Sequence, residues 1–312
     1  MKIGLFLALY GDRTLEEALD AAAAAGCEVV EIMSAPWSSH CRPAELLADP
    51  TERDRFLGLV SDRGLEISAL SCHGNPLHPN GEIAATADRA YRDTVQLAAE
   101  IGVATVITFS GCPGESEHSL RPSWVTCSWP DDFPETLAWQ WEERVLPYWR
   151  EAGAFAGAHG IRVAIEPHPG FVVYNTASML RLREGAGAAV GVNFDPSHLF
   201  WQAMDPLACV PALGDAIFHV HAKDTGFQQE QLDLNGVLEP IGGDRPAERS
   251  WIFRSVGAGH PVAWWRELVG ALRDAGYDGA LSIEHEDPLL SREDGLAFAV
   301  ATLREALAPS GG

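Results

Sequence analysis

A chain of 312 residues, 46% of them hydrophobic and 21% charged, has the composition of a globular protein with a large core. Its net charge of −22, from 44 acidic and 22 basic residues, repels nucleic-acid phosphates and anionic lipid, so both are poor partners. Apolar runs fall short of the roughly 20 residues that span a bilayer. The cysteines are scattered without a CxxC pair, so we expect reduced thiols and a cytoplasmic protein.

Short apolar runs alternate with longer periodic ones, which is the pattern of buried parallel strands followed by helices. The predicted strands are residues 1–9, 27–33, 65–72, 104–110, 162–166, 190–195, 216–222 and 280–285. The predicted helices run from a Thr14 N-cap to a Gly26 stop, and then over about 51–63, 82–100, 136–159, a short stretch after Thr176, 205–213, 261–275 and 291–307. Eight strand–helix units without a remainder, and a first turn that lacks GxGxxG, favour one α/β domain over 1–312, a (β/α)₈ TIM barrel.

Two connections are much longer than the usual handful of residues. One, at about 111–135, follows the fourth strand and holds Trp124 and Trp129. The other, at about 226–260, follows the seventh strand and holds three arginines, Arg254 among them. Loops after barrel strands lie on the C-terminal face, so both are predicted to be lids or pocket walls. Packing between subunits is an equally good interpretation of the first loop.

The last four strands end in the motifs IEPHP, NFDPSH, HVHAKD and IEHED, each with an ionisable residue where its strand leaves the barrel. These residues are Glu166, Asp195, His221 and Glu284. An unpaired carboxylate inside a barrel is costly, and strand ends open onto one mouth. Four such residues in succession therefore favour a metal site over separate ion pairs or helix caps. Three carboxylates and an imidazole suit Mn²⁺, Mg²⁺ or Co²⁺, with Zn²⁺ also open.

Further histidines lie close to the same strand ends. His73 ends the third strand in SCHGNPLHP and His198 follows the sixth in DPSH, which makes these two the best candidates for contacting substrate. His168 follows the fifth strand in IEPHP, and metal ligands are normally held by such polar neighbours. His219, two residues before the histidine of the quartet, is expected to face the barrel interior.

The quartet, the strand order and the DPSH and HVHAKD motifs resemble the xylose-isomerase-like barrels, the sugar isomerase/epimerase superfamily. The resemblance covers essentially the whole chain and is most specific in residues 163–287. It implies that Glu166, Asp195, His221 and Glu284 bind Mn²⁺ or a similar ion. It also implies that the two glutamates move protons at the carbon next to a carbonyl, and that His198 contacts substrate hydroxyls. The full candidate set for substrate binding is His73, His168, His198, Lys223 and Arg254.

Five stretches, IEPHPGFVVYN, FDPSHLFWQ, HVHAKDT, RSWIFRSVGAGH and GYDGALSIEHEDP, are similar to a narrower branch of that superfamily. This branch includes inosose isomerases and dehydratases, and the large subunits of enzymes that cleave 3-keto-glycosides, C-glycosides among them. The stretch after the first metal glutamate differs from that of tagatose and psicose epimerases, which argues against a simple ketohexose epimerase. The acidic composition argues against the DNA-cutting branch, whose members carry a three-zinc cluster and a basic surface.

The predicted activity is proton abstraction α to the carbonyl of a keto-sugar, through an enediolate and with one divalent metal, Mn²⁺ first and Co²⁺, Mg²⁺ and Zn²⁺ open. Return of the proton gives an isomerase or epimerase, which we expect. Loss of a group β to the carbonyl gives the alternative, a lyase that cleaves 3-keto-glycosides. A metal-stabilised partner subunit without turnover is the interpretation from another class, and the Glu166–Glu284 pair argues against it. The expected partners are a carbohydrate and further copies of the chain, with a small second subunit left open.

Overall fold

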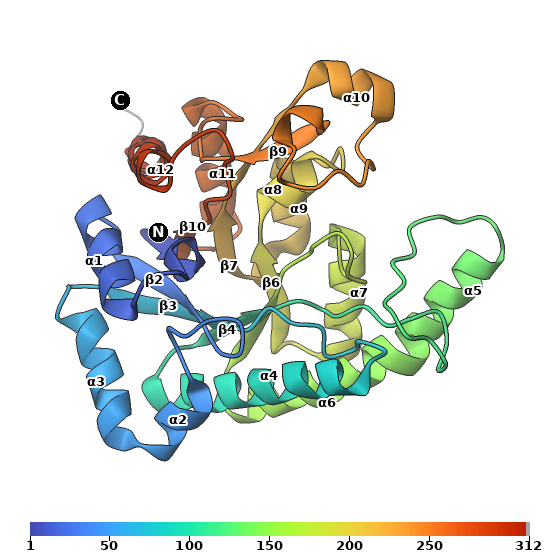
Figure 1. The fold of residues 1–312 in the computed structure, drawn as a ribbon, viewed down its shortest axis with the longest axis horizontal. Coiled ribbons are helices and arrows are strands. Elements are labelled where there is room, and N and C mark those ends of the chain that lie inside the picture. The colour runs from blue at the N-terminus through green and yellow to red at the C-terminus, as the bar shows by residue number, and fades with distance from the viewer. Residues whose placement is uncertain (310–312) are drawn as a thin grey trace.

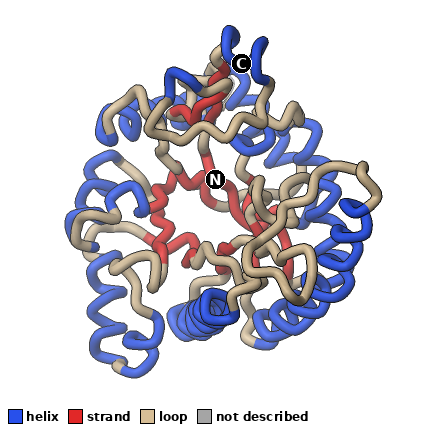
Figure 2. Tube along the Cα trace, turned by 45° about the vertical axis from the view of Figure 1, so that its right-hand side comes forward, coloured by secondary structure: helices blue, strands red, loops and turns tan. Residues whose placement is uncertain are grey.

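Eight parallel strands close into a barrel in the order β1-β10-β7-β6-β5-β4-β3-β2, and Figure 2 shows them inside a ring of helices. The computed structural model describes residues 1–309. The barrel strands are β1 (Lys2–Phe6), β2 (Val29–Met33), β3 (Glu66–Ser71), β4 (Thr105–Thr108), β5 (Arg162–Ile165), β6 (Val190–Phe194), β7 (Ile217–Ala222) and β10 (Ala280–Ile283). Each predicted strand is present, and the predicted (β/α)₈ barrel is confirmed.

Helices follow the strands around the outside of the barrel (Figure 1). The main ones are α1 (Leu15–Ala25), α3 (Pro50–Ser61), α4 (Gly81–Ile101), α6 (Leu146–Ala158), α7 (Thr176–Ala186), α9 (Pro206–Leu213), α11 (Val262–Asp274) and α12 (Arg292–Leu307). Helix α1 begins after the predicted Thr14, which forms a capping box with Glu17. It ends at Gly26, whose φ of 82° is the left-handed conformation that glycine adopts freely. Local capping chemistry therefore sets both ends of this helix.

Shorter elements lie between these helices and the strands. They are α2 (Pro43–Ala48), α5 (Asp132–Trp139), α8 (Pro196–Phe200), α10 (Gln229–Asn235), three 3₁₀ turns (Leu7–Tyr10, Gly214–Ala216 and Pro246–Glu248) and a π-helical turn (Gln140–Val145). The π-helical turn joins α5 to α6, so the helix predicted over 136–159 spans all three elements.

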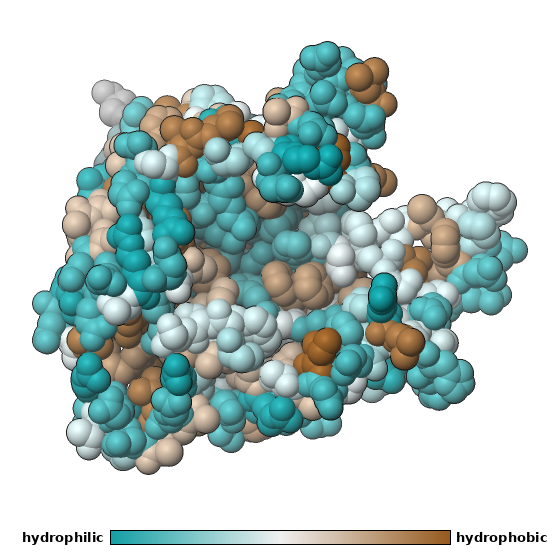
Figure 3. All heavy atoms as spheres, in the orientation of Figure 1, coloured by the Kyte–Doolittle hydropathy of each residue, from teal (hydrophilic) through white to brown (hydrophobic). Residues whose placement is uncertain are grey.

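The two long connections project from the C-terminal face of the barrel, as predicted. After β4 the chain runs out to α5, and after β7 it forms an antiparallel ribbon of β8 (Asp224–Phe227) and β9 (Trp251–Arg254), with α10 between its strands. Figure 1 shows α5 and α10 standing out beside the barrel opening. Figure 3 shows this face hollowed at its centre, with hydrophilic residues inside the hollow.

The interior of the barrel changes from apolar to polar along its axis. Ala69, Ile107 and Ala164 form a small buried cluster of their own. Nearer the carboxyl ends of the strands, polar side chains such as Asn193 and His219 are buried as well. Because buried polar groups destabilise a fold unless they are hydrogen-bonded, this layer must form a connected network. It lies directly beneath the strand ends that carry the quartet.

The helices and cysteines bear on two further predictions. Within residues 1–309, no helix has the length and apolar composition needed to cross a membrane. All six cysteines are free thiols, and Cys127 alone among them is exposed. Burial raises the pKa of Cys41 and of Cys72 to about 12, so these two thiols stay protonated and unreactive.

Candidate active site

Four strand ends converge at the barrel mouth. Glu166 and Glu284 directly follow β5 and β10, and His221 lies near the end of β7. Asp195 follows β6 and caps α8, because its side chain accepts a hydrogen bond from the backbone N–H of Ser197 at 2.8 Å. One donor atom from each of the four residues lies within 4.8 Å of those of the other three. The structure thus brings together the whole quartet named from the sequence, and one cation can contact all of it.

Several donor atoms of this quartet are buried without hydrogen bonds. Oδ2 of Asp195, Nδ1 of His221 and Oε2 of Glu284 make no hydrogen bond of good geometry in the described part of the chain, although ionic groups lie close to each of them. Nδ1 of His221 lies 3.0 Å from Oε2 of Glu284 and 3.2 Å from Oε2 of Glu166. Crowded carboxylates repel and unpartnered buried atoms are costly, so a divalent cation fits this arrangement. The donor set of three carboxylates and one imidazole nitrogen suits Mn²⁺, Co²⁺, Mg²⁺ or Zn²⁺.

Glu166 is held by three side chains. Its Oε2 accepts a hydrogen bond from Nδ2 of Asn193 at 3.0 Å and lies 3.2 Å from Nε2 of His73. Its Oε1 lies 3.3 Å from Nε2 of His198. Burial alone would raise the pKa of Glu166, but the imidazoles of His221, His198 and His73 hold that pKa well below its usual range. The carboxyl is therefore an anion in a fixed orientation, as a metal ligand must be.

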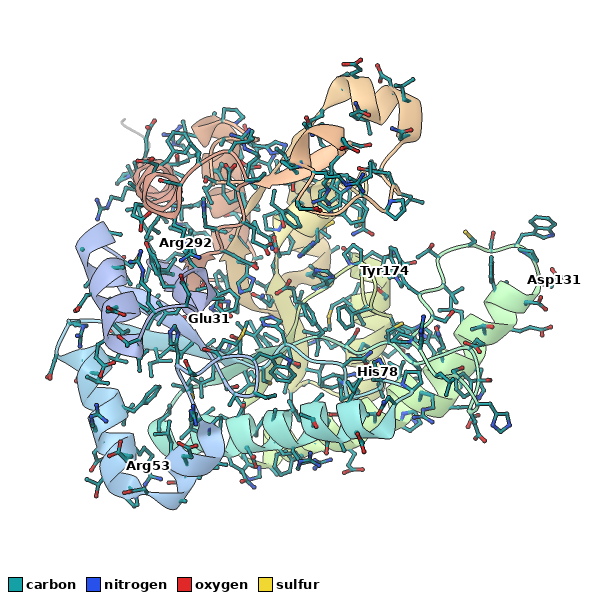
Figure 4. All side chains as sticks on the ribbon, in the orientation of Figure 1. Glu31, Arg53, His78, Asp131, Tyr174 and Arg292 are labelled. Carbon is teal, nitrogen blue, oxygen red and sulfur yellow. The ribbon has the colours of Figure 1, made fainter. Side chains whose placement is uncertain are left out.

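His221 is fixed by residues that were not among the sequence candidates. Its Nε2 lies 2.8 Å from Oε2 of Glu31, and the same oxygen accepts a hydrogen bond from Oγ of Ser282 at 3.1 Å. The ring also stacks on Phe6 with centroids 5.4 Å apart. Burial would lower the pKa of His221, but Glu31 and the two glutamates of the quartet raise it well above its usual value. Figure 4 labels Glu31, which is fully buried in β2.

Glu31 and Asn193 were not predicted as site residues, although each one is unusual at its position in the sequence. Glu31 is the one charged residue in the apolar strand VVEIM, and Asn193 interrupts the apolar strand VGVNF. A polar residue inside a barrel strand needs a hydrogen-bonding partner. The partners of both residues lie on other strands, so neither strand alone could identify them.

Lys223 places a positive charge beside two of the quartet's oxygens. Its ammonium nitrogen lies 2.9 Å from Oε2 of Glu284 and 3.3 Å from Oδ2 of Asp195. It also lies 3.0 Å from Oε2 of Glu286 and 4.4 Å from the centre of the Phe253 ring. Burial would lower the pKa of Lys223, but these three carboxylates raise it well above its usual value. The side chain is therefore a cation at the floor of the mouth, within reach of anything bound to the quartet.

His198 and His168 pack ring against ring beside the quartet. Their ring centroids are 4.1 Å apart, and Nε2 of His198 lies 3.3 Å from Oδ2 of Asp195. Nδ1 of His168 lies 2.6 Å from the carbonyl oxygen of Pro169, which can only accept, so Nδ1 carries the proton. Burial, with the neighbouring His198, lowers the pKa of His168 to about 3. His168 is therefore neutral at physiological pH and offers Nε2 as an acceptor.

Arg254 lies at the edge of this site. Its Nε donates a hydrogen bond to Oδ2 of Asp287 at 3.0 Å, and the backbone N–H of Ser255 donates to the same oxygen at 2.9 Å. These bonds tie β9 of the ribbon to the segment that follows β10. Within residues 1–309, Arg254 forms no hydrogen bond or ion pair with the quartet.

Aromatic rings lie beside the quartet, and a cavity reaches one of its members, Glu284. Phe109 stacks on Phe171 with centroids 4.3 Å apart and meets His168 edge-on at 5.0 Å. A cavity of about 360 Å³ is lined by Phe6, Leu9, Glu284, Glu286, Asp287 and Leu290, among others. This volume lies in the range of small-molecule sites. The cavity therefore gives Glu284 access to a ligand of sugar size.

The two tryptophans of the loop after β4 differ in their packing. Trp124 packs edge-on against Tyr174, with centroids 5.5 Å apart, and Tyr174, labelled in Figure 4, lies in the segment between β5 and α7. Trp129 is 76% exposed. Trp124 thus packs onto the segment that follows β5, whereas Trp129 is turned to solvent, and the aromatic rings beside the quartet are those of the phenylalanines.

The family follows from comparison with known proteins. Residues 19–306 match the family model described as xylose isomerase-like TIM barrel, and the chain belongs to that family. The uncharacterized protein YfiH of Bacillus subtilis (strain 168) is 35% identical over 316 residues, which cover 98% of this chain and 99% of that protein. An inosose dehydratase of Lacticaseibacillus casei is 29% identical over 160 residues, 51% of this chain and 51% of that protein. The chain thus aligns with about half the length of the dehydratase.

Two solved structures share the fold across nearly the whole chain. The probable 3-DHS dehydratase AsbF from Bacillus anthracis superposes with a TM-score of 0.69 at 19% identity, covering 97% of this chain and 99% of that one. The IolI protein, solved with a bound zinc atom, has a TM-score of 0.66 at 16% identity and coverage of 98% of each chain. At these low sequence identities, the comparison shows that the proteins share a fold and nothing more.

Proposed function

We propose that this protein is a divalent-metal-dependent sugar isomerase or epimerase that removes a proton from the carbon next to the carbonyl of a keto-sugar. The observation that carries the proposal is the quartet, whose donor atoms lie within 4.8 Å of one another. A cation held there, Mn²⁺ in first place, supplies Lewis-acid stabilisation of the negative charge that a ketone oxygen gains when the neighbouring carbon loses its proton. The zinc atom in the IolI structure, which shares this fold, supports a bound metal ion.

The two glutamates of the quartet are suited to different parts of the proton transfer. Both oxygens of Glu166 lie against donors, and its side chain is 4% exposed. Oε1 of Glu284 makes no hydrogen bond in residues 1–309, its side chain is 16% exposed, and it lines the 360 Å³ cavity. Glu284 is therefore the better base for the first step. Glu166 follows β5, three strands away around the barrel, and would act from the other side of the substrate.

The remaining polar groups would bind and orient the sugar. The Lys223 ammonium donates to an oxygen that carries developing negative charge, and its fixed position costs no rearrangement during the reaction. His73 and His198 approach Glu166 within 3.2 Å and 3.3 Å, so they can donate to hydroxyls beside the reacting carbon. Neutral His168 offers an acceptor. Arg254, which is bonded to Asp287 at the edge of the site, would contact substrate from the ribbon.

Elimination is the second candidate, and the pairing of Lys223 with Glu284 favours it. An ammonium 2.9 Å from the base can protonate a leaving oxygen β to the carbonyl while the base removes the α-proton. The similarity to inosose dehydratase over half of each chain and the fold shared with AsbF point the same way. A lyase on inososes or 3-keto-glycosides would use the same first step and differ only in the second.

One experiment separates these outcomes. The Mn²⁺-loaded protein is incubated in D₂O with a panel of ketohexoses, inososes and 3-keto-glycosides, and the products are read by NMR. Deuterium at the α-carbon with a moved carbonyl or an inverted centre supports the isomerase or epimerase. Loss of the β-substituent supports the lyase. Glu284→Gln is the matched control, and a wild-type protein that binds metal but exchanges no α-proton in any substrate would contradict the proposal.

A further inference from the structure

Glu31 connects the candidate metal site to β2, which lies two strands from β10 around the barrel. It lies in β2, 190 residues before His221 in the sequence, and its Oε2 is 2.8 Å from Nε2 of that histidine. Strand β1 lies between β2 and β10, and its residue Gly4 pairs with Val29 on one side and Ser282 on the other. A side chain at Gly4 would begin with a Cβ only 2.8 Å from Val29 Cγ2, so glycine leaves room at this level of the interior.

The contact assigns a different task to each nitrogen of His221. A carboxylate oxygen only accepts hydrogen bonds, so Nε2 of the imidazole donates to Glu31. Nδ1 then faces Oε2 of Glu166 at 3.2 Å and Oε2 of Glu284 at 3.0 Å. Phe6 stacks on the same ring at 23° between planes and limits its rotation. Glu31, on the far side of the ring, thus determines that Nδ1 is the nitrogen of His221 that points at the other residues of the quartet.

We propose that Glu31 is a positioning residue that selects Nδ1 of His221 as the metal-binding nitrogen and strengthens its hold on the cation. The inference rests on the proposed function, because it concerns the same metal site. A carboxylate behind a ligating imidazole fixes the ring and makes its free nitrogen a better donor. The full negative charge of Glu31 also adds to that of the three carboxylates that would face the cation.

The burial of Glu31 supports a task beyond packing. The residue is 0% exposed, and its Oε1 has no hydrogen-bond partner anywhere in residues 1–309. A buried carboxylate with one oxygen unpartnered stabilises a fold less than an apolar side chain of similar size would. Its bonds to His221 and to Ser282 Oγ, at 2.8 Å and 3.1 Å, both hold it in place behind the imidazole.

The test uses Glu31→Gln, which keeps the shape of the side chain and removes its charge. We expect the dissociation constant for Mn²⁺, measured by calorimetry on the full chain, to rise by about 10- to 100-fold. The matched control is Glu28→Gln, the same chemical change three residues earlier on an exposed side chain, and it should bind Mn²⁺ like the wild type. Thermal melting of both variants in a chelator separates a loss of metal affinity from a loss of folding.

A second measurement needs no variant. In wild-type protein labelled with ¹⁵N-histidine and loaded with ¹¹³Cd²⁺, the metal should couple to Nδ1 of His221, while Nε2 keeps its proton. Coupling to Nε2, or a Glu31→Gln variant that binds Mn²⁺ as tightly as the wild type, would overturn the inference and leave the metal site standing. A wild-type protein that binds neither Mn²⁺ nor Cd²⁺ would instead remove the proposed function itself.

Discussion

The ammonium of Lys223 lies 2.9 Å from Oε2 of Glu284 and 3.3 Å from Oδ2 of Asp195, which are two of the oxygens that face a cation in the quartet. The chain's other lysine, Lys2, pairs with Glu66 at the surface. Lys223 is thus a buried positive charge in a place where a second positive charge is expected to bind. Two cations at this range repel each other, so the lysine weakens metal binding and must contribute in another way.

Replacing Lys223 by Met should separate metal binding from turnover. Loss of the positive charge should leave the affinity for Mn²⁺ unchanged or tighter, because the competing cation is gone. Turnover on the substrate found by the D₂O screen should fall by at least about tenfold, since one fixed charge no longer stabilises the reacting oxygen. Calorimetry and steady-state kinetics measure the two effects. Lys2→Met is the control, and a parallel loss of metal binding and turnover in Lys223→Met would contradict this separation.

Glutamine in place of either quartet glutamate should slow proton transfer strongly. Glu→Gln keeps the size of the side chain and one ligand oxygen but removes the base. We expect exchange of the α-proton with D₂O to fall by at least about a hundredfold in Glu166→Gln and in Glu284→Gln, while both still bind metal, though more weakly. NMR of the recovered substrate gives the exchange rate. If both variants exchanged deuterium at close to the wild-type rate, the base would lie elsewhere, and His198 or His73 would be examined next.

The histidines that approach Glu166 should contribute to substrate binding more than Arg254 does. Alanine at His198 or His73 removes a donor beside the quartet, and we expect kcat/KM to fall by the equivalent of about 1.5–3 kcal/mol. Arg254→Ala should have a smaller effect, because the Nε of Arg254 is bonded to Asp287. Metal content is measured in each variant. Wild-type kinetics in all three would show that substrate binds to other residues.

Much of the fold and the quartet could be predicted because both depend on local sequence patterns. The alternation of apolar runs with periodic segments marks each barrel strand, and a polar residue at a strand end marks the mouth, as with Glu166 and Asp195. The network behind the quartet could not be predicted in the same way. Glu31 finds its partner 190 residues later, and that pairing depends on how the barrel closes.

The structure of the long loops could not be predicted from local sequence patterns either. The ribbon of β8 and β9 and the short helix α10 lie within 226–260, where elements of four to seven residues carry too little periodicity to be recognised. Arg254 lies near the end of that segment, and its ion-pair partner Asp287 lies in another loop, which comes close only when the chain folds. Long-range contacts of this kind decide which charged residue in a loop faces the mouth.

Asp224 should be a main stabilising residue of the loop that carries the ribbon. Its Oδ2 accepts hydrogen bonds from the backbone N–H groups of Gly257, Gly259 and His260 at 3.1, 3.1 and 2.8 Å. Asp224→Asn removes the charge from a fully buried acceptor, so we expect the free energy of unfolding to fall by at least about 2 kcal/mol. Urea denaturation measures this. The control Asp215→Asn, on a 92% exposed side chain, should leave stability nearly unchanged, and an equally small effect at Asp224 would contradict the prediction.

The buried His219 should make the protein less stable in mild acid. Its Nδ1 lies 3.0 Å from Oδ1 of Asn193, and burial lowers its pKa from 6.5 to about 4. Below pH 6.5 the unfolded chain takes up a proton that the folded chain refuses until about pH 4. The stabilisation that neutral His219 gives the folded state is therefore fully present above pH 6.5. It is lost as the pH falls to about 4, by about 3 kcal/mol in all.

Urea denaturation in a chelator, from pH 7 to pH 4, should show a shallower decline of the free energy of unfolding for His219→Gln than for the wild type. His159→Gln, which changes an exposed imidazole, should keep the wild-type slope, and identical slopes in all three proteins would mean that His219 is not held neutral in the folded state.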